Sequence, residues 1–355
     1  MLPYSARPQR CGKRLIFWKT PTMKLRILSE ADCRSLLGMS DAIAIQAEAF
    51  TWLAEGRAID GLRAVATSET PPGVAIFNPC FLRNGAGYGV KVVSDFFSNT
   101  ARGLPRMSSL LVLFDGTTGL PHTLMESGYL TDLRTGAGTG LAAQHLARSD
   151  SRVAAVIGAG RVARNQIEAI VTALPLERVL VHARNPQRGE ALIRSLPSNI
   201  ATRTTIDLCD AEKAVRQADI VVAATTSAKP VIDGAWLRPG TFVVGTGAYA
   251  AHLREIDSET IRRAACWVID SRSDCLDRAG DFIIPIEEGL LSRDDIAQLS
   301  EIISGERPGR RSADDIIVYK SSGVPIQDIV TAQHIQRRAE QAGTGVIIDI
   351  GGDHD

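Results

Sequence analysis

The sequence lacks the features that mark membrane-spanning, nucleic-acid-binding and disulfide-rich proteins. Its apolar runs, such as residues 220–224, are far shorter than the roughly 20 residues that a membrane-spanning helix needs. Forty basic and forty acidic residues give a net charge of zero, so charge gives no reason to expect nucleic acid or an anionic membrane as a partner. The six cysteines are scattered without a CxxC pair, which favours reduced thiols in a cytoplasmic protein over disulfides or a metal site.

Acidic residues are also absent from residues 1–22, which carry five lysine and arginine residues. An organelle-targeting segment is one interpretation, because such segments are basic and poor in acid. The apolar patch Leu15–Trp18 is too short for the core of a signal peptide. We favour a disordered basic extension or an over-long gene start, since an ordinary domain sequence begins at Met23.

The sequence does contain a dinucleotide-binding fingerprint. The apolar run Val153–Ile157 leads into GAG (158–160) and then into a segment of helical period, which predicts a strand, a tight turn and a helix. Gly158 permits the turn, Gly160 lets the backbone approach a pyrophosphate, and Ala163 lets the helix pack closely on the strand. The first N–H groups of that helix would face the phosphates.

Apolar segments alternate with helical segments through the second half of the chain, and this alternation predicts a parallel sheet covered by helices. Further strands are expected at residues 178–183, 201–206, 219–225, 242–247, 266–270 and 316–321. Helices are expected at residues 41–55, 130–147, 210–218, 294–304 and 326–342. A hairpin at 73–94 and strands at 110–114 and 122–127 predict a separate mixed sheet. The fold class is therefore α/β, with a Rossmann-type doubly wound parallel sheet inserted in a mixed α/β domain.

The end of the second strand of the parallel sheet indicates the choice of cofactor. An NAD site usually places an acidic residue about 20 residues beyond the glycines, where it binds the ribose 2′-hydroxyl. Here the strand ends in Arg184-Asn185, and no acid occurs between Glu177 and Glu190. An arginine at this place favours a 2′-phosphate, so we predict NADP(H) in preference to NAD(H). The alternative is an ordinary exposed arginine at a strand end.

Six collinear motifs resemble the ornithine cyclodeaminase/mu-crystallin family. They are GVKVVSDFFSNTARGLP (89–105), LTDLRTGAG (130–138), VIGAGRVARNQ (156–166), HLREID (252–257), AGDFIIPIEEG (279–289) and YKSSGVPIQD (319–328). The resemblance implies a substrate-binding and dimerisation domain built from residues 23–133 and 320–345. It also implies an NAD(P)-binding Rossmann domain at residues 134–319 and a homodimer.

The resemblance also assigns roles to individual residues. Lys91, which lies in an apolar strand, would bind the substrate and transfer a proton, and it is the candidate catalytic residue. Arg134 would pair with the substrate carboxylate, and Arg63 is a second candidate for that carboxylate. From the residues alone, Lys91 could instead lie at a solvated strand edge. The candidate cofactor-binding residues are Thr135, Gly158, Ala159, Gly160, Arg161, Val162, Ala163, Arg184, Asn185, Thr225 and Gly323.

One loop departs from the family pattern. Cyclodeaminases of the family carry an aspartate after the fifth strand, whereas this loop reads GTGAYAAHLR (245–254), with Tyr249 or a neighbour at that position. The loop is similar to that of the family's imine reductases. We therefore expect reduction of a cyclic imino acid, Δ1-pyrroline-2-carboxylate or Δ1-piperideine-2-carboxylate, to proline or pipecolate. The alternatives are an ornithine cyclodeaminase with bound NAD and a non-catalytic, mu-crystallin-like protein that binds NADPH and a small ligand.

Overall fold

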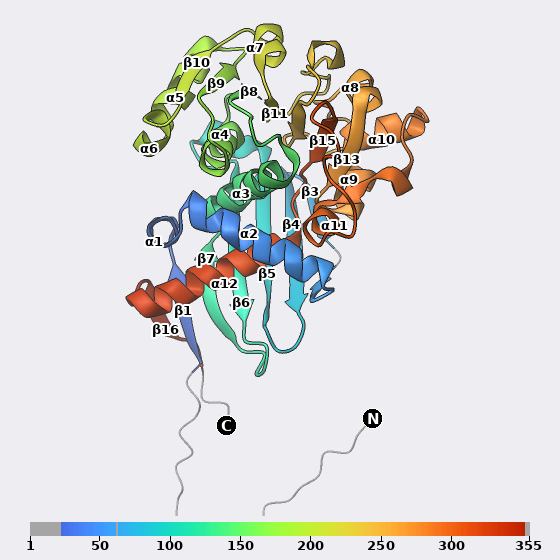
Figure 1. Ribbon diagram of the computed structural model, residues 1–355. Coiled ribbons are helices and arrows are strands. Elements are labelled where there is room, and N and C mark those ends of the chain that lie inside the picture. The colour runs from blue at the N-terminus through green and yellow to red at the C-terminus, as the bar shows by residue number, and fades with distance from the viewer. Residues whose placement is uncertain (1–22, 62, 352–355) are drawn as a thin grey trace, which may run out of the picture.

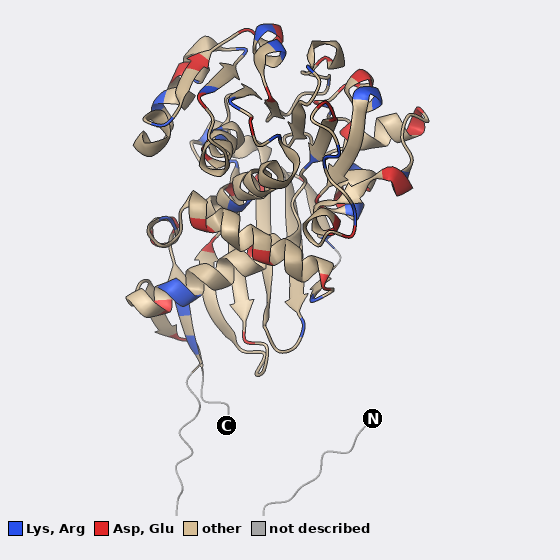
Figure 2. Ribbon diagram, viewed as in Figure 1, with Lys and Arg blue, Asp and Glu red and all other residues tan. Residues whose placement is uncertain are grey.

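The computed structural model describes residues 23–61 and 63–351, and the extension expected at residues 1–22 lies outside them. Two eight-stranded sheets form the framework. Figure 1 shows them one above the other, with the parallel sheet in the upper part of the view. Within the described residues, no helix combines the length and apolar character needed to cross a bilayer. Figure 2 shows basic and acidic positions interspersed over the described ribbon.

The first sheet is mixed and has the order β16-β1-β7-β6-β5-β4-β2, with β3 paired to β4. All its pairs are antiparallel except β1 with β7. Because β16 pairs with β1, the two ends of the described chain meet in this sheet. Its strands are β1 (Lys24–Leu28), β2 (Ala58–Asp60), β3 (Ala64–Glu69), β4 (Pro72–Leu82), β5 (Tyr88–Phe96), β6 (Met107–Phe114), β7 (Pro121–Glu126) and β16 (Val346–Asp349).

The second sheet is parallel throughout, in the order β10-β9-β8-β11-β12-β15-β13-β14. The order reverses beside β8, since β9 and β10 lie on one side of it and β11 and β12 on the other. Ligands of doubly wound sheets bind at the carboxyl ends of strands at such a point. The structure thus confirms the predicted α/β class. The strands are β8 (Val153–Ile157), β9 (Arg178–His182), β10 (Thr205–Leu208), β11 (Ile220–Ala223), β12 (Phe242–Gly245), β13 (Ala264–Ile269), β14 (Ala297–Gln298) and β15 (Ile316–Lys320).

Helices cover both sheets, and several begin at recognisable caps. Ser29 and Asp32, which are three residues apart, form a capping box at the first helix. The α-helices are α1 (Glu30–Leu36), α2 (Met39–Ala54), α3 (Gly128–Leu146), α4 (Arg161–Ala173), α5 (Pro186–Ser195), α6 (Ser198–Ala201), α7 (Ala211–Gln217), α8 (Ser258–Arg263), α9 (Arg272–Arg278), α10 (Gly280–Glu287), α11 (Leu299–Ile303) and α12 (Pro325–Ala342). Short 3-10 helices are η1 (Phe97–Arg102), η2 (Gly234–Trp236) and η3 (Arg293–Asp295).

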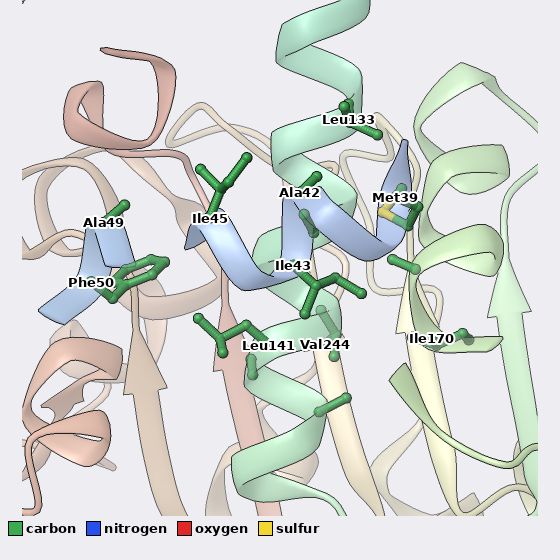
Figure 3. Close-up of a cluster of buried hydrophobic side chains, with 14 of the residues drawn as sticks. Met39, Ala42, Ile43, Ile45, Ala49, Phe50, Leu133, Leu141, Ile170 and Val244 are labelled. Carbon is green, nitrogen blue, oxygen red and sulfur yellow. The ribbon is translucent and has the colours of Figure 1, made fainter. Parts of the chain in front are cut away.

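The core joins the two sheets through α2 and α3. Figure 3 shows side chains of α2, among them Ile43 and Phe50, in one cluster with Leu141 of α3 and Val244 of β12. Across the first sheet, α2 and α12 lie side by side on one face (Figure 1). This shared core packs one face of the parallel sheet, through α2 and α3, against the helix-covered face of the mixed sheet.

Two expected elements are wrong in their extent. The helix expected at 294–304 is divided into η3, β14 and α11, because Ala297 and Gln298 pair with β13 at the sheet edge. The strand expected at 201–206 begins only at Thr205, because α6 extends to Ala201. Strand β10 then pairs in register with β9 from Thr205 to Leu208.

Candidate active site

The predicted glycine turn joins β8 to α4. Gly158 has a φ of +131°, and a Cβ on it would lie 2.5 Å from the Ala224 carbonyl oxygen, so only glycine fits there. A Cβ on Gly160 would meet nothing within 4 Å, which means that the space in front of this residue is open. Gly160 is the N-cap of α4 and has no side chain, so no N-cap side chain accepts a hydrogen bond from the first N–H groups of this helix. The turn can therefore present backbone N–H groups to a phosphate.

One hollow lies beside this turn, and a second lies at the ends of β9 and β10. The larger has a volume of about 380 Å³ and is lined by Ala159, Gly160, Arg161, Arg164, Arg188, Ala191, Leu192 and Ser195. The smaller, of about 270 Å³, is lined by Val181, His182, Ala183, Pro186, Leu208, Cys209 and Asp210. The described lining of the larger hollow carries three guanidinium groups and no carboxylate. Its charge suits a phosphate ester.

Arg184 and Asn185 lie between the end of β9 and the start of α5. The Asn185 side chain caps that helix by accepting a hydrogen bond from the Arg188 N–H. The guanidinium groups of Arg184 and Arg188 make no hydrogen bond or ion pair with the residues that the structure describes. Two guanidinium groups without a partner among the described residues therefore lie where the adenosine ribose of a dinucleotide is expected.

The other end of the candidate cofactor site lies where β11 and β15 end. Thr225 follows β11, and its hydroxyl donates to Glu255 Oε1 over 2.9 Å. Gly323 follows β15 with a φ of +84°, and a Cβ on it would lie 2.3 Å from Arg134 Nη1. The loop of Gly323 therefore lies directly against the arginine predicted to bind substrate. Thr135, the next residue of α3, donates to the Thr131 carbonyl oxygen.

Lys91 reaches this region from the mixed sheet. In the register of β4, β5 and β6, Lys91 pairs with Asn78 and Leu111, and all three are buried. Because side chains alternate between the faces of a strand, this row shares the helix-covered face. The solvated edge position that the residues alone left open for Lys91 is therefore wrong.

Asp328, on the first turn of α12, joins two of the predicted residues. Lys91 Nζ lies 2.7 Å from its Oδ2, and Arg134 Nε lies 2.9 Å from its Oδ1. Arg134 also donates to Gln327 Oε1 over 3.3 Å, and Lys91 donates to Thr131 Oγ1 over 3.3 Å. The three charged side chains are at most 8% exposed. One carboxylate therefore balances two buried cations, which leaves this cluster with a net positive charge.

Burial and the ion pair oppose each other at Lys91. Burial lowers the pKa of the ammonium to about 8, although Asp328 acts to raise it. For Asp328, burial favours the neutral acid, but Arg134 and Lys91 outweigh it and lower the pKa of the carboxyl. Lys91 is thus protonated at neutral pH and able to release its proton, as a general acid requires.

Arg63 enters from the connection between β2 and β3. Its Nη1 lies 2.9 Å from Asp274 Oδ1 on α9. This ion pair joins a connection of the mixed sheet to a helix that lies between two strands of the parallel sheet in sequence. Its Nε is buried and has no hydrogen-bond partner among the described residues. Arg63 is not in hydrogen-bond contact with Lys91, Arg134 or Asp328. The Nε–H group of Arg63 could therefore donate a hydrogen bond to an anion.

The loop after β12 contains no nearby replacement for the cyclodeaminase aspartate. Tyr249 is 57% exposed, and the first carboxylate of the loop is Glu255. Both Glu255 oxygens accept hydrogen bonds from the protein, at Thr225, Gly247 and Ala248. A carboxylate that is fully engaged in this way is not free to act on a substrate amine.

Asp328 is the site residue that the sequence reasoning missed. The last quoted motif, YKSSGVPIQD, ends on it, and it is an acid followed by the apolar Ile329 and Val330 near the start of a helix. An acidic residue within an otherwise apolar stretch of a helix indicates a buried charge, and this was the signal that could have identified it. Its two partners lie far away in the sequence, so the signal did not identify them.

This chain is similar in sequence and in fold to known proteins. The model of the "Ornithine cyclodeaminase/mu-crystallin family" matches residues 23–343. A Δ1-pyrroline-2-carboxylate reductase of Paracoccus denitrificans is 39% identical over 257 residues, which are 71% of this chain and 80% of that protein.

Two solved structures resemble the whole described fold. Thermococcus litoralis Δ1-pyrroline-2-carboxylate reductase, in complex with NADH and L-proline, is 35% identical with a TM-score of 0.85, over 90% of this chain and 99% of that chain. An archaeal alanine dehydrogenase dimer with bound NAD is 30% identical with a TM-score of 0.85, over 93% of this chain and 100% of that chain.

Proposed function

Because this chain belongs to the ornithine cyclodeaminase/mu-crystallin family, we propose that it is an NAD(P)H-dependent reductase of a cyclic imino acid. The proposed substrate is Δ1-pyrroline-2-carboxylate or Δ1-piperideine-2-carboxylate, and the product is L-proline or L-pipecolate. The named relatives with the first of these activities, and the similar structure that holds NADH with proline, support this substrate class.

The cluster of Lys91, Arg134 and Asp328 beside Gly323 carries the proposal. Its net positive charge lies at the carboxyl edge of the dinucleotide-binding sheet, where a small anionic substrate would meet the cofactor. Arg134 offers a planar guanidinium that suits a carboxylate. The unpartnered Nε of Arg63 is a second donor for the same group.

The residues of the glycine turn fit the pyrophosphate of a dinucleotide, because the space before Gly160 is open and the first turn of α4 has no side-chain cap. Arg184 would hold a 2′-phosphate, with Arg188 close by in the first turn of α5. We therefore propose NADP(H) in preference to NAD(H), although the similar structures hold NADH and NAD. The absence of an acid between Glu177 and Glu190 supports this choice.

In the proposed mechanism the protein binds the substrate, orients it and supplies one proton. Arg134 and Arg63 would hold the carboxylate and so set which face of the C=N bond is presented. Lys91 Nζ would donate its proton to the imine nitrogen, which becomes the secondary amine of the product. The bound reduced cofactor supplies the hydride for the C=N carbon. The orientation imposed by the site lowers the barrier.

The loop of residues 245–254 favours reduction over cyclodeamination. It has no carboxylate, and Glu255 is engaged with backbone N–H groups. The acid–base group that acts on the amines of a diamino acid is therefore missing. A non-catalytic binding protein would not need a lysine with a lowered pKa beside the carboxylate-binding arginine.

A spectrophotometric screen tests the proposal. NADPH and NADH oxidation is followed with each cyclic imino acid, and ammonia release is followed with ornithine. We expect cofactor oxidation that depends on the imino acid, and no ammonia. Ammonia release without net cofactor turnover would identify a cyclodeaminase, and NADPH binding without either reaction would identify a binding protein.

The uncovered face of the mixed sheet supports a homodimer. Phe77, Val92 and Leu110 pair across β4, β5 and β6, one residue from the buried row of Lys91, so they point to the opposite face. On that face Phe81, Tyr88 and Phe114 stack, with ring centroids 5.2 and 4.7 Å apart. We propose that a second copy covers this apolar face, and that residues 23–133 with 320–345 form the substrate-binding and dimerisation domain.

A further inference from the structure

Glu255 joins two loops at the carboxyl edge of the parallel sheet. Its Oε1 accepts from the N–H and the hydroxyl of Thr225, over 2.5 and 2.9 Å. Its Oε2 accepts from the N–H groups of Gly247 and Ala248, over 2.6 and 2.9 Å. The side chain is fully buried. One carboxylate therefore holds the loop after β11 and the loop after β12 together.

These two loops are also in close contact. A Cβ on Gly247 would lie 1.9 Å from the Thr225 carbonyl oxygen, so the backbones touch at this point. Beyond the ends of β11 and β12 the two chains no longer form the hydrogen bonds of a parallel sheet. The carboxylate of Glu255 accepts hydrogen bonds from their N–H groups instead. Without it, the four donors would lose their acceptor, and two of them are the N–H groups of the buried residues Gly247 and Ala248.

A second buried pair holds Glu255 in place. Asp281 Oδ1 accepts from the N–H groups of Glu255 and Ile256, and Asp281 Oδ2 lies 2.8 Å from Lys320 Nζ. Lys320 ends β15 and is fully buried. Burial raises the pKa of Glu255, while the nearby Lys320 acts to lower it. Three strand ends, those of β11, β12 and β15, are thus tied to one network.

We propose that Glu255 is a positioning residue for the nicotinamide half of the cofactor. The inference rests on the proposed function, in which the substrate binds at the cluster beside Gly323, so that the reacting nicotinamide would lie at this end of the site, where β11 and β15 end. Glu255 sets the position of Thr225 relative to residues 247–248 and so shapes the wall of that end of the site. Gly158 of the glycine turn packs against Ala224, the residue before Thr225, but neither the turn nor Arg184 forms a hydrogen bond or ion pair with Glu255 among the described residues.

The test compares two ligands by isothermal titration calorimetry. NADPH carries the nicotinamide, and 2′-phospho-ADP-ribose is the same molecule without it. Glu255→Gln keeps the size of the side chain but replaces one acceptor oxygen by a donor. We expect NADPH binding to weaken by roughly 10- to 100-fold, as for the loss of charged hydrogen bonds. We expect 2′-phospho-ADP-ribose binding to stay within about twofold of wild type.

Asp219→Asn is the matched control. Asp219 is also a buried carboxylate of this sheet, but it accepts from the N–H groups of Arg152 and Val153 at the start of β8. It thus acts at the opposite edge. Its loss should lower the melting temperature without changing the ratio of the two affinities.

Equal weakening of both ligands in Glu255→Gln, or no weakening of either, would overturn the inference. If Glu255→Gln does not fold, Glu255→Asp retains the charge with a shorter reach and should show the same selective loss. Wild-type protein that binds neither NADPH nor NADH would instead overturn the proposed function. If NADH is the cofactor, NADH and ADP-ribose replace the two ligands, and the expected selectivity is the same.

Discussion

Lys91 Nζ lies 2.7 Å from Asp328 Oδ2, so a lysine of the β4–β5 hairpin and an acid of the C-terminal helix form one buried ion pair. The same carboxylate binds Arg134 through its other oxygen. The lysine can be removed while Asp328 keeps a partner, but removal of the acid leaves two cations unpaired. The two substitutions should therefore have different effects.

Lys91→Met should lower kcat/KM for the imino acid by roughly 10²- to 10⁴-fold, the usual contribution of a general acid. NADPH affinity should not change, because Lys91 does not contact the glycine turn. Steady-state kinetics and calorimetry measure the two effects. Lys213→Met, at an exposed position of α7, is the control and should behave as wild type. Near-normal turnover in Lys91→Met would refute the assigned role.

Asp328→Asn should lower the free energy of unfolding by roughly 3–5 kcal/mol, because it leaves buried cations without their counter-charge. Urea unfolding followed by circular dichroism measures this loss. Asp41→Asn is the comparison, since Asp41 pairs with Arg338 on α12 but is 51% exposed. A solvated pair of that kind contributes about 1 kcal/mol or less. Similar losses in the two variants would contradict a buried ion pair at Asp328.

The pH dependence of turnover follows from the lowered pKa of Lys91, about 8. A lysine that acts as an acid works in its protonated form, and the protonated fraction falls as the pH rises through about 8. We therefore expect kcat/KM to decline above that pH. The substrate imine also titrates, so the Lys91→Met profile with the same substrate provides the reference. If the decline is the same in both proteins, it does not come from Lys91.

The glycine turn was predictable because its signal is local. A strand, two glycines and a helix follow one another within residues 153–170, and each residue type has a direct steric reason. The cluster at Asp328 was not predictable from spacing, since β5, α3 and α12 meet only after both sheets are formed. The resemblance identified Lys91 and Arg134 but not the acid between them.

The helix predicted at 294–304 was wrong because the apolar spacing of this segment fits a helix, whereas Ala297 and Gln298 pair with the edge strand β13.

Arg184→Ala should raise the KM for NADPH by roughly tenfold or more, since it removes a charged partner of the 2′-phosphate. The KM for NADH should change by less than about twofold, because NADH has no phosphate there. Steady-state kinetics with each cofactor at saturating imino acid measures both values. Arg178→Ala is a suitable control, because Arg178 starts β9 at the opposite edge and pairs with Asp207. A wild-type enzyme that prefers NADH would overturn the assignment of Arg184.

Leu110→Asp should convert the proposed dimer into a monomer. Leu110 is 51% exposed in the structure and lies in the row with Phe77 and Val92 on the uncovered face of the mixed sheet. A carboxylate buried between two apolar faces costs several kcal/mol, whereas on a solvated face it costs little. Light scattering coupled to size-exclusion chromatography should give the mass of two chains for wild type and of one chain for Leu110→Asp. Val346→Asp on β16, which is 64% exposed and outside that row, should remain dimeric. A monomeric wild-type protein, or a Leu110→Asp variant that stays dimeric, would show that this face does not bind a second copy.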